Sequence, residues 1–207
     1  MKKNLLLLAA ALGIATASYA QTSYGLKGGV TFPKLSLTGG SMSYTSDAAT
    51  GFYLTGYADV PVASNFSFQP GISLQNKGGK FTTDEYIDFE TDATSGTVNL
   101  MYIEVPLNFV YNIPAGPGNV FLGAGPYAAY GVSVKAKTGS LSESGSFNEM
   151  DLNAFDAGVN FLGGYRLSNG FLINAGYGLG LANMLKDVEG DVAMKNKVFS
   201  VGIGFQF

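Results

Sequence analysis

The chain has 207 residues, enough for one domain, and 13% of them are charged, against roughly 25% in a typical soluble domain. Its net charge of −3 leaves no basic excess, so we expect no nucleic-acid partner. The sequence contains no His and no Cys, which excludes a disulfide framework, most transition-metal sites and most nucleophile–base pairs. We therefore expect neither enzyme activity nor a cofactor.

The N-terminus has the features of a secretory signal peptide. Two lysines follow the initiating methionine, an apolar run extends from Leu5 to Ala15, and small residues, Ser18 and Ala20, stand where a signal peptidase would cleave. The apolar run is short for the alternative, a membrane anchor. We expect residues 1–20 to be the signal peptide and residues 21–207 to form a single domain.

Alternating apolar and polar residues predict the elements of that domain. In chain order, the pattern indicates eight β-strands, at residues 23–37, 51–60, 66–77, 98–112, 120–135, 153–167, 171–183 and 197–207. Short links, 61–65, 113–119 and 168–170, alternate with long polar loops, 38–50, 78–97, 136–152 and 184–196. Three short turns on one rim and four long loops on the other are typical of an up-and-down barrel in an outer membrane.

The hairpin at residues 98–135 shows the alternation most clearly. Its second arm places Val132 and Val134 on the apolar face and Ser133 and Lys135 on the opposite face. The opposite face of the strands is rich in glycine, which we expect to make room for side chains inside the barrel.

Alternation alone does not show which face of the barrel is outside, because the strands of a soluble lipocalin-like barrel would also alternate. The volume of the side chains decides between the two. Each strand offers several large apolar residues, and eight such sets would not fit inside an eight-stranded barrel. The apolar face should therefore meet lipid. The predicted fold class is all-β: an eight-stranded antiparallel transmembrane β-barrel with short periplasmic turns and long extracellular loops.

Several segments of the mature chain resemble known outer-membrane barrels. The chain ends on the aromatic residue Phe207 after an alternating strand, which is similar to the assembly signal of such proteins. The motifs YGLKGGV (24–30), YIEVPLNFVY (102–111), GAGPYAAYG (123–131) and FDAGVNFLGGYRL (155–167) resemble the PorT-type "porin family" of Bacteroidota, and the architecture is similar to the small OmpA-type barrel. The resemblance implies an outer-membrane location and contact with lipid and with the barrel-assembly machinery. The family's namesake is implicated in a protein-secretion system, so that role is one alternative for this chain.

Charged residues inside the predicted barrel are the first candidate site. Six charged residues are at the alternate strand positions whose side chains should point inward: Lys27, Asp59, Lys77, Glu104, Asp156 and Arg166. Mixed signs in a narrow interior predict ion pairs, since an unpaired buried charge is costly. We expect Glu104 to pair with Arg166, and Asp156 with Lys27, in either a solid polar core or a gated pore.

A second candidate lies in the loop at 78–97. Its acidic residues are Asp84, Glu85, Asp88, Glu90 and Asp92. They could form a calcium site or a surface for a basic ligand, but their spacing does not match an EF-hand. The simpler interpretation is a solvated acidic loop, and we predict no metal site.

These patterns favour a monomeric outer-membrane protein with a structural or surface-interaction role, in which the long loops could bind an extracellular ligand. Two alternatives stay open. One is a narrow porin that passes ions or small solutes, and the other is a membrane component of a protein-secretion system.

Overall fold

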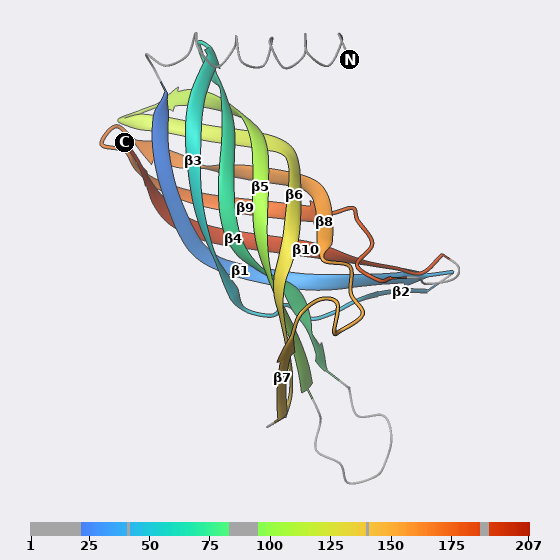
Figure 1. Ribbon diagram of the computed structural model, residues 1–207. Coiled ribbons are helices and arrows are strands. Elements are labelled where there is room, and N and C mark those ends of the chain that lie inside the picture. Colours follow the sequence, from blue (N-terminus) through green and yellow to red (C-terminus); the bar gives the residue numbers. More distant parts are fainter. Residues whose placement is uncertain (1–21, 41, 83–94, 140, 187–190) are drawn as a thin grey trace.

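The structure, a computed structural model, describes residues 22–40, 42–82, 95–139, 141–186 and 191–207. It is one antiparallel sheet that closes on itself, because β1 pairs with β10 (Figure 1). Within the described residues the ring consists of β1 (Ser23–Gly39), β3 (Gly51–Ala63), β4 (Phe66–Thr82), β5 (Ser95–Ala115), β6 (Gly118–Thr138), β8 (Phe155–Leu167), β9 (Phe171–Gly180) and β10 (Ala193–Gln206). The predicted eight-stranded barrel is thus confirmed, and closure pairs the edges that an open sheet would expose.

The short connections gather at one end of the barrel, the short-turn rim (upper left in Figure 1). They join β3 to β4, β5 to β6, and β8 to β9. Gly116 and Gly170 take positive φ angles of 58° and 91° in two of these turns, a conformation that favours glycine. The start of β1 and the end of β10 meet at the same rim, where Tyr24 and Phe207 exchange backbone hydrogen bonds of 3.0 and 2.8 Å. The opposite end is the long-loop rim.

The outer wall of the barrel is apolar, as the alternation predicts. Leu26, Ile72 and Ile203 are 52%, 67% and 58% exposed, although each is a large aliphatic side chain. An apolar wall of this kind is stable against lipid and not against water. Among the described residues, no helix is long and apolar enough to cross a membrane.

One part of the predicted alternation was wrong. The register between β5 and β6 shifts between Met101 and Tyr102, which is a β-bulge. Beyond the bulge, Val134 points inward and is 2% exposed, whereas Ser133 and Lys135 are exposed. An extra residue in one strand reverses the two faces from that point on, and the sequence pattern alone does not reveal it.

The strands also continue farther past the barrel wall than the sequence indicated. β5 and β6 contain 21 residues each, a length of about 70 Å at a rise near 3.4 Å per residue, against the roughly 30 Å hydrocarbon core of a bilayer. Two short strands, β7 (Leu141–Gly145) and β2 (Met42–Thr45), extend the sheet beside β6 and β1. Much of the predicted loops is therefore β-sheet beyond the long-loop rim.

Aromatic rings inside the barrel pack across glycines on neighbouring strands. Gly158 of β8 lies directly opposite Tyr127 of β6, and a Cβ atom at Gly158 would lie 2.8 Å from Tyr127 Cε1. Gly25 is opposite Tyr57 in the same way, and its missing side chain leaves room for the ring. At these two positions glycine therefore provides space for a large inward side chain, which is the role expected for the glycines of the inner face.

Candidate functional site: two charged tiers in a filled lumen

The charged side chains of the lumen form two tiers at different heights. The first, which we call the Lys77 tier, consists of Lys77 from β4, Glu104 from β5 and Asp156 from β8. Lys77 Nζ lies 2.9 Å from Glu104 Oε2 and 2.9 Å from Asp156 Oδ2. The three side chains are 1%, 3% and 0% exposed. A single cation thus links two carboxylates across the barrel, in surroundings closed to solvent.

Two tyrosine rings surround the cation of this tier. Lys77 Nζ lies 4.0 Å from the ring centroid of Tyr127 and 5.1 Å from that of Tyr102. The Tyr127 hydroxyl also donates a hydrogen bond of 3.3 Å to Asp156 Oδ2. The ring faces partly replace the hydration that the ammonium group loses on burial.

Amide groups also donate hydrogen bonds to the two carboxylates. Asn160 Nδ2 donates to Glu104 Oε1 at 2.9 Å, and Asn196 Nδ2 donates to Asp156 Oδ2 at 3.3 Å. These bonds supply part of the hydrogen bonding that a buried ion pair needs, although Asp156 Oδ1 is buried without a hydrogen-bond partner in the protein.

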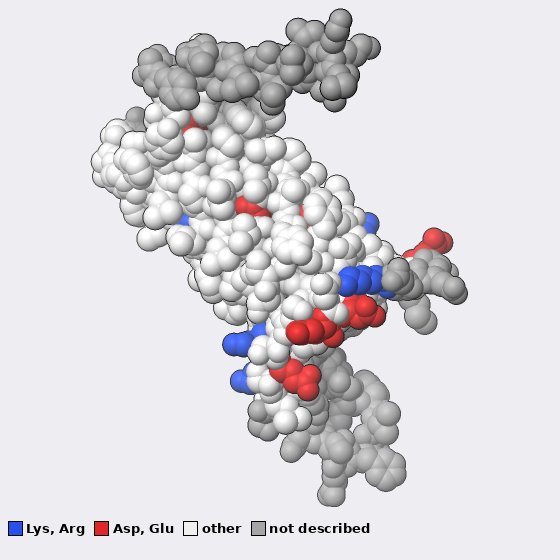
Figure 2. All heavy atoms as spheres, in the orientation of Figure 1, with Lys and Arg blue, Asp and Glu red and all other residues white. Residues whose placement is uncertain are grey.

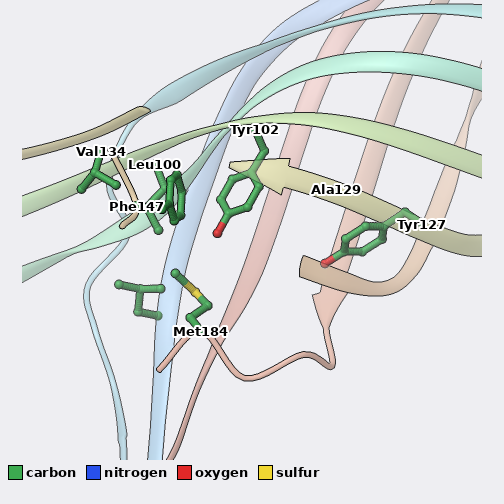
Figure 3. Packing of buried hydrophobic residues seen from close by; sticks show 8 residues of the cluster. Leu100, Tyr102, Tyr127, Ala129, Val134, Phe147 and Met184 are labelled. Atoms are coloured by element: carbon green, nitrogen blue, oxygen red, sulfur yellow. The ribbon is translucent and has the colours of Figure 1, made fainter. Parts of the chain in front are cut away.

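A hydrophobic cluster, which we call the apolar cap, covers the Lys77 tier on the side of the long-loop rim. Figure 3 shows its residues Leu100, Val134, Phe147 and Met184 together with the Tyr102 and Tyr127 rings. Phe147, from the segment after β7, is 2% exposed and packs edge-on against the Tyr102 ring, with ring centroids 5.1 Å apart. Met184, from the connection between β9 and β10, is fully buried in the same cluster. Segments from outside the barrel wall thus fill the lumen where it would otherwise open.

The second tier, the Arg166 tier, lies near the short-turn rim. Arg166 Nη1 is 3.3 Å from Asp59 Oδ2, and the two side chains are 18% and 6% exposed. Gln69 and Gln206 donate hydrogen bonds of 3.0 and 2.9 Å to the same carboxylate. Arg166 also donates to the Gln206 side chain and to Asn112. This tier balances one cation against one anion within a network of neutral amides.

Between the tiers lies a small polar space. A cavity of about 60 Å³ is lined by Lys27, Glu104 and Asn108, among others, and a second one, of about 10 Å³, lies beside Lys27 and Arg166. Asn108 Oδ1 is buried and has no hydrogen-bond partner in the protein. The larger cavity has room for a few water molecules. Lys27 Nζ lies 5.3 Å from the Tyr57 ring centroid.

The structure places the six predicted charged residues on the inner side of the wall but changes their partners. Glu104 pairs with Lys77 rather than Arg166, and Asp156 pairs with Lys77 rather than Lys27. Both predicted pairs were therefore wrong. Alternation along a strand identifies which side chains point inward. The height of each side chain along the barrel axis depends on strand tilt and stagger. Whether these residues form a functional site stays a prediction.

The other predicted site residues are placed as follows. The acidic patch, Asp84 to Asp92, lies outside the described residues. Phe207 is at the barrel seam, 74% exposed. In the part of the chain that is described, no three His, Cys, Asp or Glu residues are grouped so that they could hold a metal ion.

Sequence reasoning did not select the neutral partners of the charged tiers. Tyr127 and Tyr102 have inward parity, so the alternation could have identified them as neighbours of a buried cation. Phe147 offers a weaker signal, as an isolated aromatic residue in the polar segment SLSESGSFNEM. Its role depends on how the loop folds back over the barrel.

The chain is similar to several solved structures and matches one family model. The chain is similar to solved structures of Neisserial surface protein A (TM-score 0.46, 12% identity, 90% of this chain and 99% of that one), Ail from Yersinia pestis (0.44, 14%, 89% and 98%) and OprG from Pseudomonas aeruginosa (0.42, 11%, 89% and 95%). No curated protein matches it in sequence. The family model described as "Outer membrane protein beta-barrel domain" matches residues 19–186. The chain therefore belongs to this family of β-barrels and is a protein of the outer membrane.

Proposed function

We propose that this protein is a surface-interaction protein, in which the barrel is a membrane anchor and the extension beyond the long-loop rim contacts a partner outside the cell. The observation that carries the proposal is a contrast within the molecule. The lumen is filled by the two charged tiers and the apolar cap, whereas β4, β5, β6 and β7 continue together as a sheet past the barrel wall.

The filled lumen argues against the porin alternative. An ion or small solute would have to displace Lys77 from two carboxylates and two tyrosine rings, and also pass Phe147. Eight-stranded barrels have interiors that side chains can fill completely. A passage through this lumen would need a large rearrangement rather than a rotamer change.

The outer face of the extension has the character of a polar interface. Thr97 of β5 lies directly opposite Lys80 of β4 and Lys137 of β6, and Lys137 lies opposite Ser142 of β7. Hydroxyl and ammonium groups thus form a row across four strands. A row of this kind suits a hydrated, hydrogen-bonded contact, and Leu141, which is 74% exposed, adds one apolar contact at its edge.

Narrower proposals follow from the resemblance to PorT-type barrels. If the chain is of that type, the partner would be another component of a secretion system. Export through a signal peptide at residues 1–20, insertion by the barrel-assembly machinery and a monomeric state belong to the same proposal. It includes no catalytic step and no cofactor.

Planar-bilayer conductance of the folded barrel is the first test, with heat-modifiable gel migration as the folding control. We expect a folded sample without steady conductance steps. The variant Phe147→Ala, which removes part of the apolar cap, should still be silent because the Lys77 tier remains. Reproducible steps from the unmodified barrel would instead favour a small porin.

A second experiment tests the interaction directly. A photo-crosslinking amino acid at Leu141, at the edge of the extension, should give a discrete crosslinked protein on intact cells. The same group at Ile203, on the lipid-facing wall, should not. If Leu141 yields no protein product while the barrel is present at normal levels, the interaction role is contradicted.

A further inference from the structure

Three lysines lie together on the outer face of the barrel seam, where β1 meets β10. They are Lys34 of β1 and Lys195 and Lys197 of β10. Their neighbours Leu35 and Asn196 are 3% and 1% exposed and point into the barrel, so the lysines point outward. Lys34 and Lys197 are directly opposite each other in the antiparallel register.

This arrangement places like charges at the shortest cross-strand spacing. Residues directly opposite in an antiparallel pair have Cβ atoms about 5 Å apart, and like charges there destabilise the pair. Within the described residues every ion pair lies inside the barrel, so no described carboxylate partners these lysines. Lys197 Nζ has a neutral partner, the Ser36 hydroxyl, at 3.2 Å. An anion between the lysines would relieve the repulsion.

The position of the lysines relative to the lipid-facing wall indicates what kind of anion would bind between them. One outward position farther into the membrane, Phe32 and Phe199 are also directly opposite, with stacked rings whose centroids are 6.2 Å apart. Val30 and Val201 follow at the next outward position, and all four are exposed on the apolar wall. Lys34 and Lys197 thus stand about 7 Å above the Phe32–Phe199 pair, where the hydrocarbon gives way to headgroups, and Lys195 is one outward position farther along β10.

The distribution of charge on the face of the molecule seen in Figure 2 agrees with this height. Figure 2 shows charged side chains gathered around the long-loop end, whereas the visible barrel wall is almost free of them. Lysine stems can lie along an apolar wall while the ammonium group reaches the interface.

We propose that Lys34, Lys195 and Lys197 form a binding site for the phosphate groups of an anionic lipid headgroup in the outer leaflet. The Phe32–Phe199 pair beneath would contact the acyl chains of the same lipid. The site goes beyond the proposed interaction function, because it faces the membrane beside the barrel rather than a partner above it. Its continuity with the lipid-facing wall favours a lipid over a free anion or a protein.

Amine acetylation of the folded barrel in nanodiscs tests the proposal without any mutation. The nanodiscs contain phosphatidylcholine alone or phosphatidylcholine with diphosphoryl lipid A. We expect the lipid A to slow acetylation of the three lysines several-fold. Lys186, which donates a hydrogen bond to Asn148 on a loop, is the internal control and should not change. Equal acetylation of the three lysines in both nanodiscs would overturn the site.

A binding measurement then separates the possible sources of the phosphate. Native mass spectrometry should show lipid A retained by the barrel, with affinity falling about fivefold for each lysine removed in a Lys34→Gln, Lys195→Gln and Lys197→Gln series. Lys186→Gln should bind normally. Equal retention of dephosphorylated lipid A, or equal protection of the lysines by inorganic phosphate, would overturn the proposal of a phosphorylated lipid.

Discussion

The two tiers of the lumen use the same kind of ion pair in different surroundings. The Lys77 tier holds two carboxylates on a single ammonium group, with side chains at most 3% exposed. The Arg166 tier holds one carboxylate, which also accepts two amide hydrogen bonds, and its arginine is 18% exposed. Burial and the number of alternative partners, rather than the distance between charges, should therefore decide how much each tier contributes to stability.

Lys77→Met should give the largest effect. It leaves Glu104 and Asp156 buried without a cation, and removal of one partner of a buried pair costs about 3–5 kcal/mol. Urea unfolding in lipid vesicles should show a loss of that size in the free energy of unfolding.

A neutral version of the same tier is the control. Lys77→Met combined with Glu104→Gln and Asp156→Asn removes all three charges, so most of the lost stability should return. If the triple variant is as unstable as the single one, the loss comes from packing against the tyrosine rings and not from uncompensated charge.

Arg166→Met should have a smaller effect, of about 2 kcal/mol, because Asp59 keeps its two amide donors and some access to water. The same unfolding experiment measures it. A loss as large as that of Lys77→Met would show that the two tiers do not differ in the way that their burial indicates.

Alanine substitution of one glycine beside each tier would show how tightly the two tiers are packed. In Gly158→Ala the new methyl group would meet the Leu179 carbonyl oxygen as well as the Tyr127 ring, whereas in Gly25→Ala the nearest atoms belong to the Tyr57 side chain alone. Backbone cannot move aside as a ring can, so Gly158→Ala should destabilise the barrel by about 1–3 kcal/mol and Gly25→Ala by less. Gly56→Ala, with nothing within 4 Å, is the matched control and should be neutral.

The smallest effect concerns the loop that carries Phe147 over the Lys77 tier. The Ser146 backbone N–H donates to Glu149 Oε2 at 2.7 Å, and this bond lowers the pKa of Glu149 below its ordinary value of 4.5. A lowered pKa means that the bond contributes fully above pH 4.5 and is lost as the pH falls through the pKa of the folded state.

Amide hydrogen exchange measures this effect. The protection factor of the Ser146 amide should fall at acid pH in the unmodified barrel. In Glu149→Gln it should be lower at neutral pH and should change little with pH. Protection in the unmodified barrel that does not vary with pH would remove any role for this carboxylate in holding the cap.

Much of the barrel could be predicted from the sequence because its physical signals are local. Each strand alternates with a period of two, and two of the three short turns carry a glycine with a positive φ angle, so strand count, inward face and rim assignment follow from neighbouring residues. The bulge beside Met101 breaks the alternation without a local signal, which is why Val134 and Lys135 were assigned to the wrong faces.

The partners inside the lumen depend on the tertiary structure alone. Lys77 and Asp156 are 79 residues apart, and they meet because barrel closure, strand tilt and stagger bring β4 and β8 to the same height across the lumen. The position of Phe147 over this tier likewise depends on how a loop folds back. The sequence by itself determined that a closed apolar-walled barrel forms, since alternation is a property of each strand; which charge meets which was decided only when all eight strands were in register.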